Sequence, residues 1–377
     1  MNIREAYQTV NRVRNLVRDE RQDGPMFDFS SRERLWLYRR RFLSKSGVLY
    51  DFDTYEPTTY LDDYQRYVRS GRINGHWGAL IDNKLAFHQI LREFPSSRST
   101  VYGLLKDGQF HVFESEDDDV AVASDGGIEL ERSPDPNPSR PSVDPIEWLD
   151  DTLSDGDRLV LKWFSGGGGN NVHFLEREDG SYLYDGAPMN DAELAETLAD
   201  LEDYLVCEFV EQGEYADELY PDTVNTIRVL TMYDEDAQEA FIPIAVQRIG
   251  TSNSAPVDNF SKGGLSAEVD RETGELSAGA HYYHKESVTW HETHPETGAR
   301  IEGTEIPGWE EIRTKLLEIA DTLSHMPYVG WDVVVTDEGE FKIIEGNSQT
   351  GVAAMQVHRP LLADDRTRRF YRKHDVI

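Results

Sequence analysis

Hydrophobic and polar residues alternate at two different periods along this chain, and the change of period separates helical from strand-rich stretches. Residues 1–75 predict helices, because aromatic and leucine positions are interleaved with arginines at helical spacing. A further helix is predicted from Asp82, where DNKLAFHQILREF begins with a residue typical of an N-cap. By contrast, VYGLLKDGQFHVF at 101–113 predicts a β-hairpin that turns at Asp107 and Gly108.

Short strands and helices follow each other through the rest of the chain. The segments LVLKWF, VHFLER and SYLYDG predict strands, and DAELAETLADLEDYL predicts an amphipathic helix capped by Asp191. Further strands are predicted in VCEFV, TIRVLTM and FIPIAVQRI, and a helix over 309–325 precedes the strands VGWDVVVT and EFKIIEG. The Pro-rich stretch 133–145 is typical of a linker. Strand-rich segments with intervening helices indicate an α+β protein with largely antiparallel sheets.

Length and composition restrict the class of protein. The chain has 377 residues, of which 38% are hydrophobic, enough for two or three packed domains. No apolar run approaches the roughly 20 residues that span a bilayer, and the N-terminus lacks the apolar centre of a signal peptide. The single cysteine, Cys207, excludes an intramolecular disulfide. We therefore expect a cytoplasmic protein without a transmembrane segment.

The net charge of −33 changes how partners can be inferred. Few lysines among many carboxylates indicate a salt-accumulating halophile, in which molar salt shortens the Debye length to about 3 Å. The acidity therefore says little about partners, and no nucleic acid is expected. Residues 1–72, however, hold 14 basic and 11 acidic side chains. Their arginine-rich helices either contact an anionic membrane or glycan, or dock on the acidic remainder of the chain.

Four consecutive glycines, Gly166, Gly167, Gly168 and Gly169, separate two predicted strands, and Lys162 lies in the first of them. No Gly-Lys-Ser/Thr follows, and a strand rather than a helix comes next, so neither a P-loop nor a dinucleotide fingerprint is present. A glycine hairpin can close over a polyphosphate, although a plain turn has the same composition. Lys162 favours the phosphate, because a lysine in an apolar strand is costly to bury without an anion. An exposed strand face is the alternative.

The stretch GWDVVVTDEGEFKIIEGNSQTG near the C-terminus predicts a metal site. If Glu338 and Gly339 form a two-residue hairpin loop, Asp332 faces Glu345 with Cβ atoms about 4.5–5.5 Å apart. Asn347, two residues further on, projects from the same face. Facing carboxylates destabilise a sheet unless a cation lies between them, and oxygen donors of this kind suit Mg²⁺. The alternative, an acidic pair in solvent, is disfavoured by the flanking VVV and KII.

Together these features resemble the ATP-grasp superfamily. The chain is most similar to the sugar-transfer-associated ATP-grasp proteins, and more distantly to ribosomal-protein glutamate ligases and tubulin-tyrosine ligase, over roughly residues 78–360. The resemblance implies an α+β ATP-grasp fold, in which two α+β lobes hold a nucleotide between them. It predicts three ranges: an Arg-rich helical N-terminal region at 1–75, an N-terminal part with the small nucleotide-closing lobe at 76–205, and the C-terminal lobe with hinge, metal site and acceptor region at 206–377.

The resemblance also implies roles for individual cationic and amide residues. NKLAFHQIL supplies Lys84 as the first nucleotide-binding lysine, and Lys162 with the four glycines resembles the second lysine and its phosphate-covering loop. NTIRV places Arg228 near the transferred phosphate. DNFSKGG resembles an Asn-containing loop and implicates Asn259 and Lys262 in catalysis.

A hinge strand that holds adenine is implied by VCEFVEQGE at 206–214. By resemblance, Glu208, Phe209 and Val210 contact the base, and Glu211 or Glu214 contacts the ribose. The segment HPETGARIEGTEIPGW is also typical of the sugar-associated subfamily.

The chemistry implied by the resemblance requires ATP and one or two Mg²⁺ ions, for which Mn²⁺ can substitute, held by Asp332, Glu345 and Asn347. ATP-grasp ligases activate a carboxylate as an acyl phosphate, which an amine or hydroxyl then attacks. We expect a ligase that joins an amino acid or similar small acid to an amine or sugar acceptor in cell-surface polysaccharide biosynthesis. The alternatives are a phosphotransferase acting on a hydroxyl and a non-catalytic nucleotide-binding module.

Overall fold

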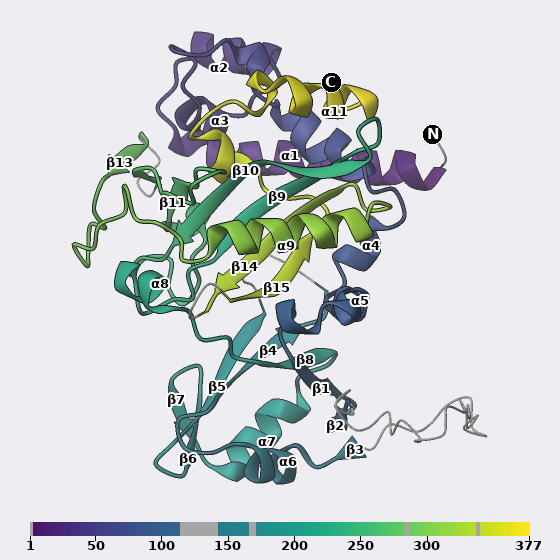
Figure 1. Ribbon diagram of the computed structural model, residues 1–377, viewed down its shortest axis with the longest axis vertical. Coiled ribbons are helices and arrows are strands. Elements are labelled where there is room, and N and C mark those ends of the chain that lie inside the picture. The colour runs from purple at the N-terminus through teal and green to yellow at the C-terminus, as the bar shows by residue number, and fades with distance from the viewer. Residues whose placement is uncertain (1–2, 114–141, 166–170, 283–286, 337–339) are drawn as a thin grey trace. The chain divides into compact units, whose positions relative to one another are not determined.

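The computed structural model describes residues 3–113, 142–165, 171–282, 287–336 and 340–377 (Figure 1). The chain forms two compact units. Unit 1 comprises Met1–Arg98 and Val210–Ile377, and unit 2 comprises Ser99–Phe209. Each unit contains one antiparallel sheet accompanied by helices, so the predicted α+β class is confirmed. The three functional ranges 1–75, 76–205 and 206–377 stay a prediction.

Unit 2 contains an eight-stranded sheet in the order β3-β2-β1-β8-β4-β5-β6-β7. Its strands are β1 Val101–Lys106, β2 Gln109–Val112, β3 Ser142–Val143, β4 Arg158–Trp163, β5 Val172–Glu178, β6 Ser181–Tyr184, β7 Ala187–Met189 and β8 Tyr204–Glu208. Asp107 and Gly108 both have positive φ between β1 and β2, which confirms the predicted hairpin and its turn.

Two helices, α6 Pro145–Thr152 and α7 Asp191–Ala199, cover one face of the unit 2 sheet. Their leucines Leu149 and Leu194 pack against Leu161 of β4 and Leu175 of β5. Helix α7 is capped by Asn190, whose side chain accepts from the Glu193 N–H, and not by Asp191 as expected. The capping box that Glu193 completes explains the choice, because it satisfies two N–H groups at once.

Unit 1 contains a seven-stranded sheet in the order β13-β12-β11-β10-β9-β14-β15. Its strands are β9 Ile227–Asp234, β10 Glu239–Ile249, β11 Leu265–Glu268, β12 Gly279–His281, β13 Thr289–His291, β14 Tyr328–Val335 and β15 Phe341–Asn347. Its helices are α1 Ile3–Asp23, α2 Ser31–Arg39, α3 Ser44–Leu49, α4 Gly78–Ile81, α5 Lys84–Ile90, α8 Glu214–Leu219, α9 Trp309–Thr322, α10 Ala353–Gln356 and α11 Asp365–Lys373. No described helix has both the length and the apolar character needed to cross a membrane.

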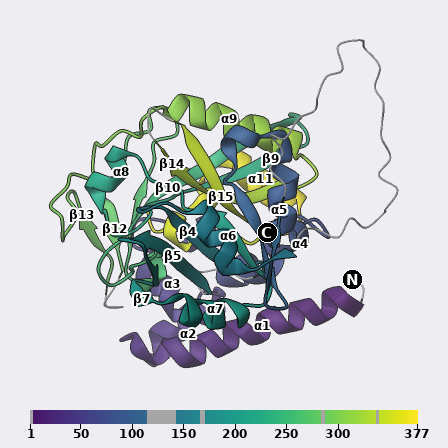
Figure 2. The ribbon, with the colours of Figure 1, turned by 90° about the horizontal axis from the view of Figure 1, so that it is seen from below.

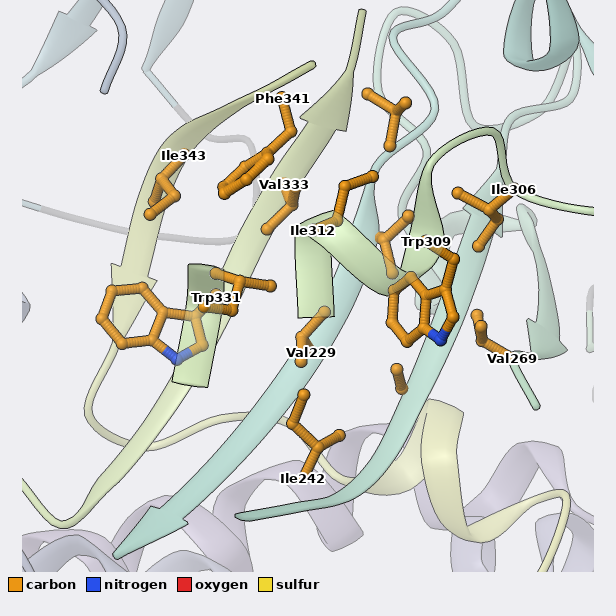
Figure 3. Close-up of a cluster of buried hydrophobic side chains, with 14 of the residues drawn as sticks. Val229, Ile242, Val269, Ile306, Trp309, Ile312, Trp331, Val333, Phe341 and Ile343 are labelled. Carbon is orange, nitrogen blue, oxygen red and sulfur yellow. The ribbon is translucent and has the colours of Figure 1, made fainter. Parts of the chain in front are cut away.

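The largest core lies between helix α9 and one face of the unit 1 sheet. Trp309 and Ile312 of α9 pack in one cluster with Val229 of β9 and with Trp331 and Val333 of β14 (Figure 3). Alternate residues of a strand face opposite ways. Arg228 and Leu230 of β9 and Asp332 of β14 therefore project from the other face of the sheet.

That other face is apolar towards one end. Leu230 and Met232 of β9 and Tyr328 of β14 pack there with Phe370 and Tyr371 of helix α11. The amino-terminal helices cover a further part through a separate cluster, in which Phe42 and Leu49 contact residues of β12 and α10. These helices do not cover the remaining end of the face. Polar side chains lie there, and they form the candidate site.

Helix α5 shows how a capping residue was misassigned from the sequence. Its N-cap is Asn83, whose side chain accepts from the Ala86 N–H, and not the expected Asp82. The Asp82 carboxylate instead accepts from the backbone N–H of Ser348 at 3.0 Å and from its hydroxyl at 2.7 Å. Asp82 therefore ties the start of α5 to the chain just after β15.

Candidate functional site

Four sequence-predicted residues meet on the face of the unit 1 sheet opposite α9. Arg228 of β9 pairs in register with Asp332 of β14, and Asp332 pairs with Glu345 of β15. Asn347 pairs with Gly330, two residues before Asp332 on the same strand, so it shares this face. The facing of Asp332 and Glu345 is confirmed.

The register of this hairpin near its turn differs from the predicted one. A register set by a two-residue loop would pair Val335 with Lys342, but Val335 pairs with Phe341. The register shifts between Val333 and Asp332, where Ile344 is the extra residue of a β-bulge. The bulge restores the expected register only from Asp332 onward. Glu338 and Gly339 lie outside the described residues.

Asp332 is the most deeply buried carboxylate of the site, with only 3% of its surface exposed. Its two oxygens accept from the Arg228 guanidinium, from Nε at one oxygen and from Nη2 at 2.9 Å at the other. Nη2 of Arg248 lies 3.5 Å from the second oxygen. Burial disfavours the charged carboxylate, yet the two arginines hold the pKa of Asp332 below its ordinary value. Asp332 is thus a paired anion.

Arg248 is held in place by a second buried carboxylate. Its Nη2 lies 3.1 Å from Oδ1 of Asp258, and its Nε donates to the Thr226 hydroxyl at 2.9 Å. The other oxygen of Asp258 accepts from the Thr226 N–H at 2.7 Å and from its hydroxyl at 2.6 Å. These contacts fix the direction of the Arg248 guanidinium towards Asp332.

Lys84 forms the third ion pair. It is the first residue of α5, and its Nζ lies 3.1 Å from Oε1 of Glu345, with side chains 12% and 25% exposed. The face therefore carries three cations, Lys84, Arg228 and Arg248, and three carboxylates, Asp258, Asp332 and Glu345. The cluster is electrically balanced without any ligand.

Oxygen donors suited to a hard cation are present on this face. Asp332 and Glu345 supply carboxylates, and Asn347 supplies an amide whose nitrogen donates to Gly330 O at 3.4 Å and which also hydrogen-bonds Asp332. Within the described part of the chain, no three His, Cys, Asp or Glu side chains gather as metal ligands. A set of metal ligands at this face therefore needs the amide oxygen of Asn347. It also needs Asp332 to give up its ion pairs with the two arginines.

The loop that contains Asn259 and Lys262 follows β10. The Asn259 side chain accepts from the Ser261 N–H at 2.8 Å, which caps a short 3₁₀ turn at Phe260–Lys262. Lys262 is exposed. The buried residue of this loop next to the arginines is Asp258, one position before the residue that we singled out.

Lys162 belongs to unit 2, on the sheet face opposite helices α6 and α7. It pairs in register with Val172 of β5 and Leu205 of β8, and its side chain is half-buried. Gly166, Gly167, Gly168 and Gly169 lie outside the described residues.

The predicted hinge strand contains the boundary between the units. Glu208 and Phe209 belong to unit 2, where Glu208 accepts from the Thr100 N–H at 2.7 Å and Arg158 stacks 3.8 Å from the Phe209 ring centre. The chain enters unit 1 at Val210, which is buried.

Beyond Val210 the hinge residues diverge in exposure. Glu211 and Glu214 are exposed, and Glu214 opens helix α8. Between them Gly213 donates to Val335 O at 2.8 Å, and a Cβ on it would lie 2.7 Å from Thr336 O. This close approach of two backbones is the reason a glycine is needed there.

Two residues of the cluster, Arg248 and Asp258, were missed by the sequence reasoning. A signal for Arg248 existed, because it follows Ile244 and Val246 at alternate positions of an apolar strand, as Lys162 does in β4. Asp258 carried no comparable pattern, since its role comes from a loop folding back on Thr226.

A family model described as "Sugar-transfer associated ATP-grasp" matches residues 72–368 of the chain. Of the curated proteins compared with the chain, none matches. Among solved structures, the chain is similar to a D-alanine–D-alanine ligase from Bacillus anthracis, with 14% identity, a TM-score of 0.37, and coverage of 82% of this chain and 78% of that one.

Two further solved structures are similar over a smaller part of their own length. One is the ADP complex of an N5-carboxyaminoimidazole ribonucleotide synthetase, with 12% identity, a TM-score of 0.36, and coverage of 76% of this chain and 52% of that one. The other is a D-Ala:D-Ser ligase from Enterococcus faecalis, with 12% identity, a TM-score of 0.36, and coverage of 78% and 62%. The chain thus spans less than two thirds of either protein.

Proposed function

Since this chain belongs to the sugar-transfer associated ATP-grasp family, we propose that it is an ATP- and Mg²⁺-dependent ligase that activates a small carboxylic acid as an acyl phosphate. We propose an amino acid or similar acid as the donor, and an amine or hydroxyl of a cell-surface polysaccharide precursor as the acceptor. The observation that carries the proposal is the balanced cluster of three cations and three carboxylates on the unit 1 sheet.

The cluster has the composition that phosphoryl transfer requires, because such a reaction depends on positioning and on neutralising phosphate charge. A triphosphate at this face offers Arg228 and Arg248 new oxygen acceptors in place of Asp332. That exchange would free both oxygens of Asp332, which would then hold a divalent cation together with Glu345 and Asn347. When bound, the ion neutralises phosphate charge and polarises the transferred phosphoryl group.

Lys84 is proposed to follow the same exchange, from Glu345 to a phosphate oxygen. Its present 3.1 Å ion pair keeps the ammonium on the face where it is needed. In unit 2, Lys162 and the four glycines at 166–169 are proposed to bind phosphates. Glu208, Phe209 and Val210 are proposed to contact adenine, and Glu211 or Glu214 the ribose.

The proposed reaction proceeds in two displacements. A carboxylate oxygen of the acid attacks the γ-phosphorus of ATP, and the bond to the β–γ bridging oxygen breaks with loss of ADP. An amine or hydroxyl then attacks the acyl carbon, gives its proton to solvent or to a basic group, and displaces phosphate. Asn259 and Lys262, in the loop beside Asp258, are proposed to act on the acid or the acyl phosphate.

The proposal is tested by ADP release from mixtures of acids with amines and sugar nucleotides, in the presence of Mg²⁺ and at high KCl because the composition predicts a salt-rich cytoplasm. Mass spectrometry of the product distinguishes the outcomes. A condensed amide or ester with free phosphate supports the ligase, whereas a phosphorylated acceptor replaces it with the phosphotransferase. ATP binding without turnover across the whole panel would leave only a nucleotide-binding module.

Glu345→Gln is the sharpest single variant for this test. We expect ADP formation to fall by at least about a hundredfold, because the glutamine is neutral and binds a cation poorly. The free energy of unfolding should change by only about 1 kcal/mol, because the pair with Lys84 is partly exposed. Near-normal turnover in this variant contradicts the metal role of Glu345. Glu318→Gln on α9, exposed and paired with Lys315, is the matched control.

A further inference from the structure

The first 40 residues carry most of the large apolar side chains that the described structure leaves in solvent. Thirteen such side chains are exposed among the described residues, and seven of them precede residue 40: Tyr7, Val10, Val17, Met26, Leu35, Trp36 and Tyr38. Scattered exposed apolar residues are ordinary on protein surfaces, but their concentration in one short segment indicates a contact surface.

Helix α1 has an inner and an outer stripe. On the inner stripe Leu16 is buried, Arg12 donates to Val68 O at 3.3 Å, and Glu20 accepts from the Ser44 N–H at 2.9 Å. These contacts anchor α1 to the rest of unit 1. Positions 10, 14, 17 and 21 follow each other at helical spacing on the other side, and all four are exposed. The outer stripe thus alternates valine with arginine.

Helix α2 has the same kind of arrangement. Leu37 is buried, whereas Arg32, Leu35, Trp36 and Arg39 are exposed at i, i+3, i+4 and i+7. The hydroxyl of Tyr38 donates to Glu20 at 2.6 Å, so the last turn of α2 meets the last turn of α1, near one end of the long helix (Figure 2).

We define the basic–apolar face as the exposed side chains of these two stripes: Val10, Arg14, Val17, Arg21, Arg32, Leu35, Trp36 and Arg39. Among the acidic neighbours, Glu20 accepts from the Ser44 N–H, Glu33 accepts from the Ser30 N–H at 2.7 Å and Asp19 pairs with Arg18, whereas Asp23 and Asp28 are exposed. The defined face itself holds four arginines and no carboxylate, on a protein whose net charge is −33.

We propose that the basic–apolar face binds the surface of an anionic lipid bilayer, with α1 and α2 lying in the headgroup layer. The combination of groups favours lipid over other anions. A polysaccharide or other soluble polyanion would engage the arginines but gives no partner to Leu35, Val10 or Val17. A bilayer accepts both, because apolar side chains enter the acyl boundary while guanidinium groups stay among the headgroups.

Charge complementarity also sets the orientation. At about 0.1 M KCl, where the Debye length is about 10 Å, an anionic bilayer repels the acidic remainder of the chain, which favours approach through the basic–apolar face. Trp36 suits the boundary, because its ring is apolar and the Arg40 guanidinium stacks 4.2 Å above its centre.

Vesicle flotation tests the proposal with the full-length protein. We expect binding to phosphatidylcholine vesicles that contain about 30% phosphatidylglycerol, and at least about tenfold weaker binding to pure phosphatidylcholine, because anionic lipid attracts juxtaposed arginines. Raising KCl to about 2 M should weaken but not abolish the binding, since screening acts on the arginines and not on the apolar side chains.

Two sets of variants separate the contributions. The triple change Val17→Ser, Leu35→Ser, Trp36→Ser and the triple change Arg14→Gln, Arg21→Gln, Arg39→Gln should each weaken binding by about tenfold or more. Trp36→Ser alone guards against misfolding of the triples. Trp290→Ser is the matched control, because Trp290 is 52% exposed on β13, outside the face.

Three results overturn the proposal. The first is no flotation with anionic vesicles at about 0.1 M KCl, where the Debye length is about 10 Å. The second is flotation that both triples and Trp36→Ser leave unchanged. The third is a wild-type protein that is a dimer by analytical ultracentrifugation and does not bind vesicles, together with variants that are monomers and do not bind vesicles either. The face would then join two copies of the chain.

Discussion

The two sheets of this protein surround the cations that we propose for nucleotide binding in opposite ways. In unit 1, Arg228 and Arg248 are bound by the buried carboxylates of Asp332 and Asp258. In unit 2, Lys162 lies between Val172 and Leu205, and within the described residues no carboxylate pairs with it. The charges of unit 1 are therefore paired before any ligand binds, whereas Lys162 has no carboxylate partner among the residues that the structure describes.

This comparison predicts that a nucleotide is bound by two different electrostatic routes. On the unit 1 face, anions of the ligand must exchange with anions of the protein, so the gain in binding free energy is a difference between two strong interactions. If Lys162 binds phosphate as proposed, the ligand meets an ammonium that has no carboxylate partner in the described part of the chain, on a half-buried strand position where an ion pair is less screened than in water.

The largest expected effect comes from Asp332→Ala. Removal of this carboxylate leaves the Arg228 guanidinium buried without its partner, and breaking a buried pair costs about 3–5 kcal/mol. Urea unfolding at high KCl measures the loss. The double variant Arg228→Met, Asp332→Leu is the matched control, since removing both charges should recover most of the stability. A loss below about 1 kcal/mol in Asp332→Ala would break the comparison.

A smaller effect, on binding rather than folding, is expected from Lys162→Met. The methionine keeps most of the apolar stem, so the midpoint of thermal unfolding without ligand should stay within a few degrees of wild type, or rise. The affinity for ADP, measured by titration calorimetry, should fall by about ten- to hundredfold, because one charge-assisted hydrogen bond is lost. Unchanged ADP affinity would show that Lys162 is an ordinary surface lysine.

The smallest and most specific effect concerns pH. The pKa of Asp332 is lower in the folded protein than its ordinary 3.8, because Arg228 and Arg248 outweigh the effect of burial. Its contribution to stability is therefore complete above pH 3.8 and is lost as the pH falls through the lower folded value. The stability difference between wild type and Asp332→Asn should stay constant from about pH 7 to pH 4.5. Narrowing of that difference already between pH 6 and pH 5 would mean that burial dominates and that Asp332 carries a raised pKa.

How far the site could be predicted depends on the range of the interactions. Asp332 and Glu345 are 13 residues apart on consecutive strands, so a short hairpin was expected to pair them, and the pairing holds because the bulge at Ile344 offsets the one-residue difference in register nearer the turn. The bulge at Ile344 was not foreseen, because local sequence carries no rule for where an extra residue is accommodated. Arg248 and Asp258 were missed for a stronger reason: their partners Asp332 and Thr226 are distant in the chain and meet only through the sheet.

The sequence by itself determined the α+β class, the hairpins at Asp107 and at Asp332–Glu345, and the residue types that a nucleotide and a cation require. These features follow from period, turn chemistry and charge, which act between residues that are close along the chain. Only the tertiary structure decided that the carboxylates at 332 and 345 are paired with arginine and lysine, and that the outer stripes of α1 and α2 stay in solvent. Both depend on which strands and helices pack together. A buried charge is stable only beside an opposite charge, and tertiary packing decides which residue supplies that charge, however distant it is in the sequence.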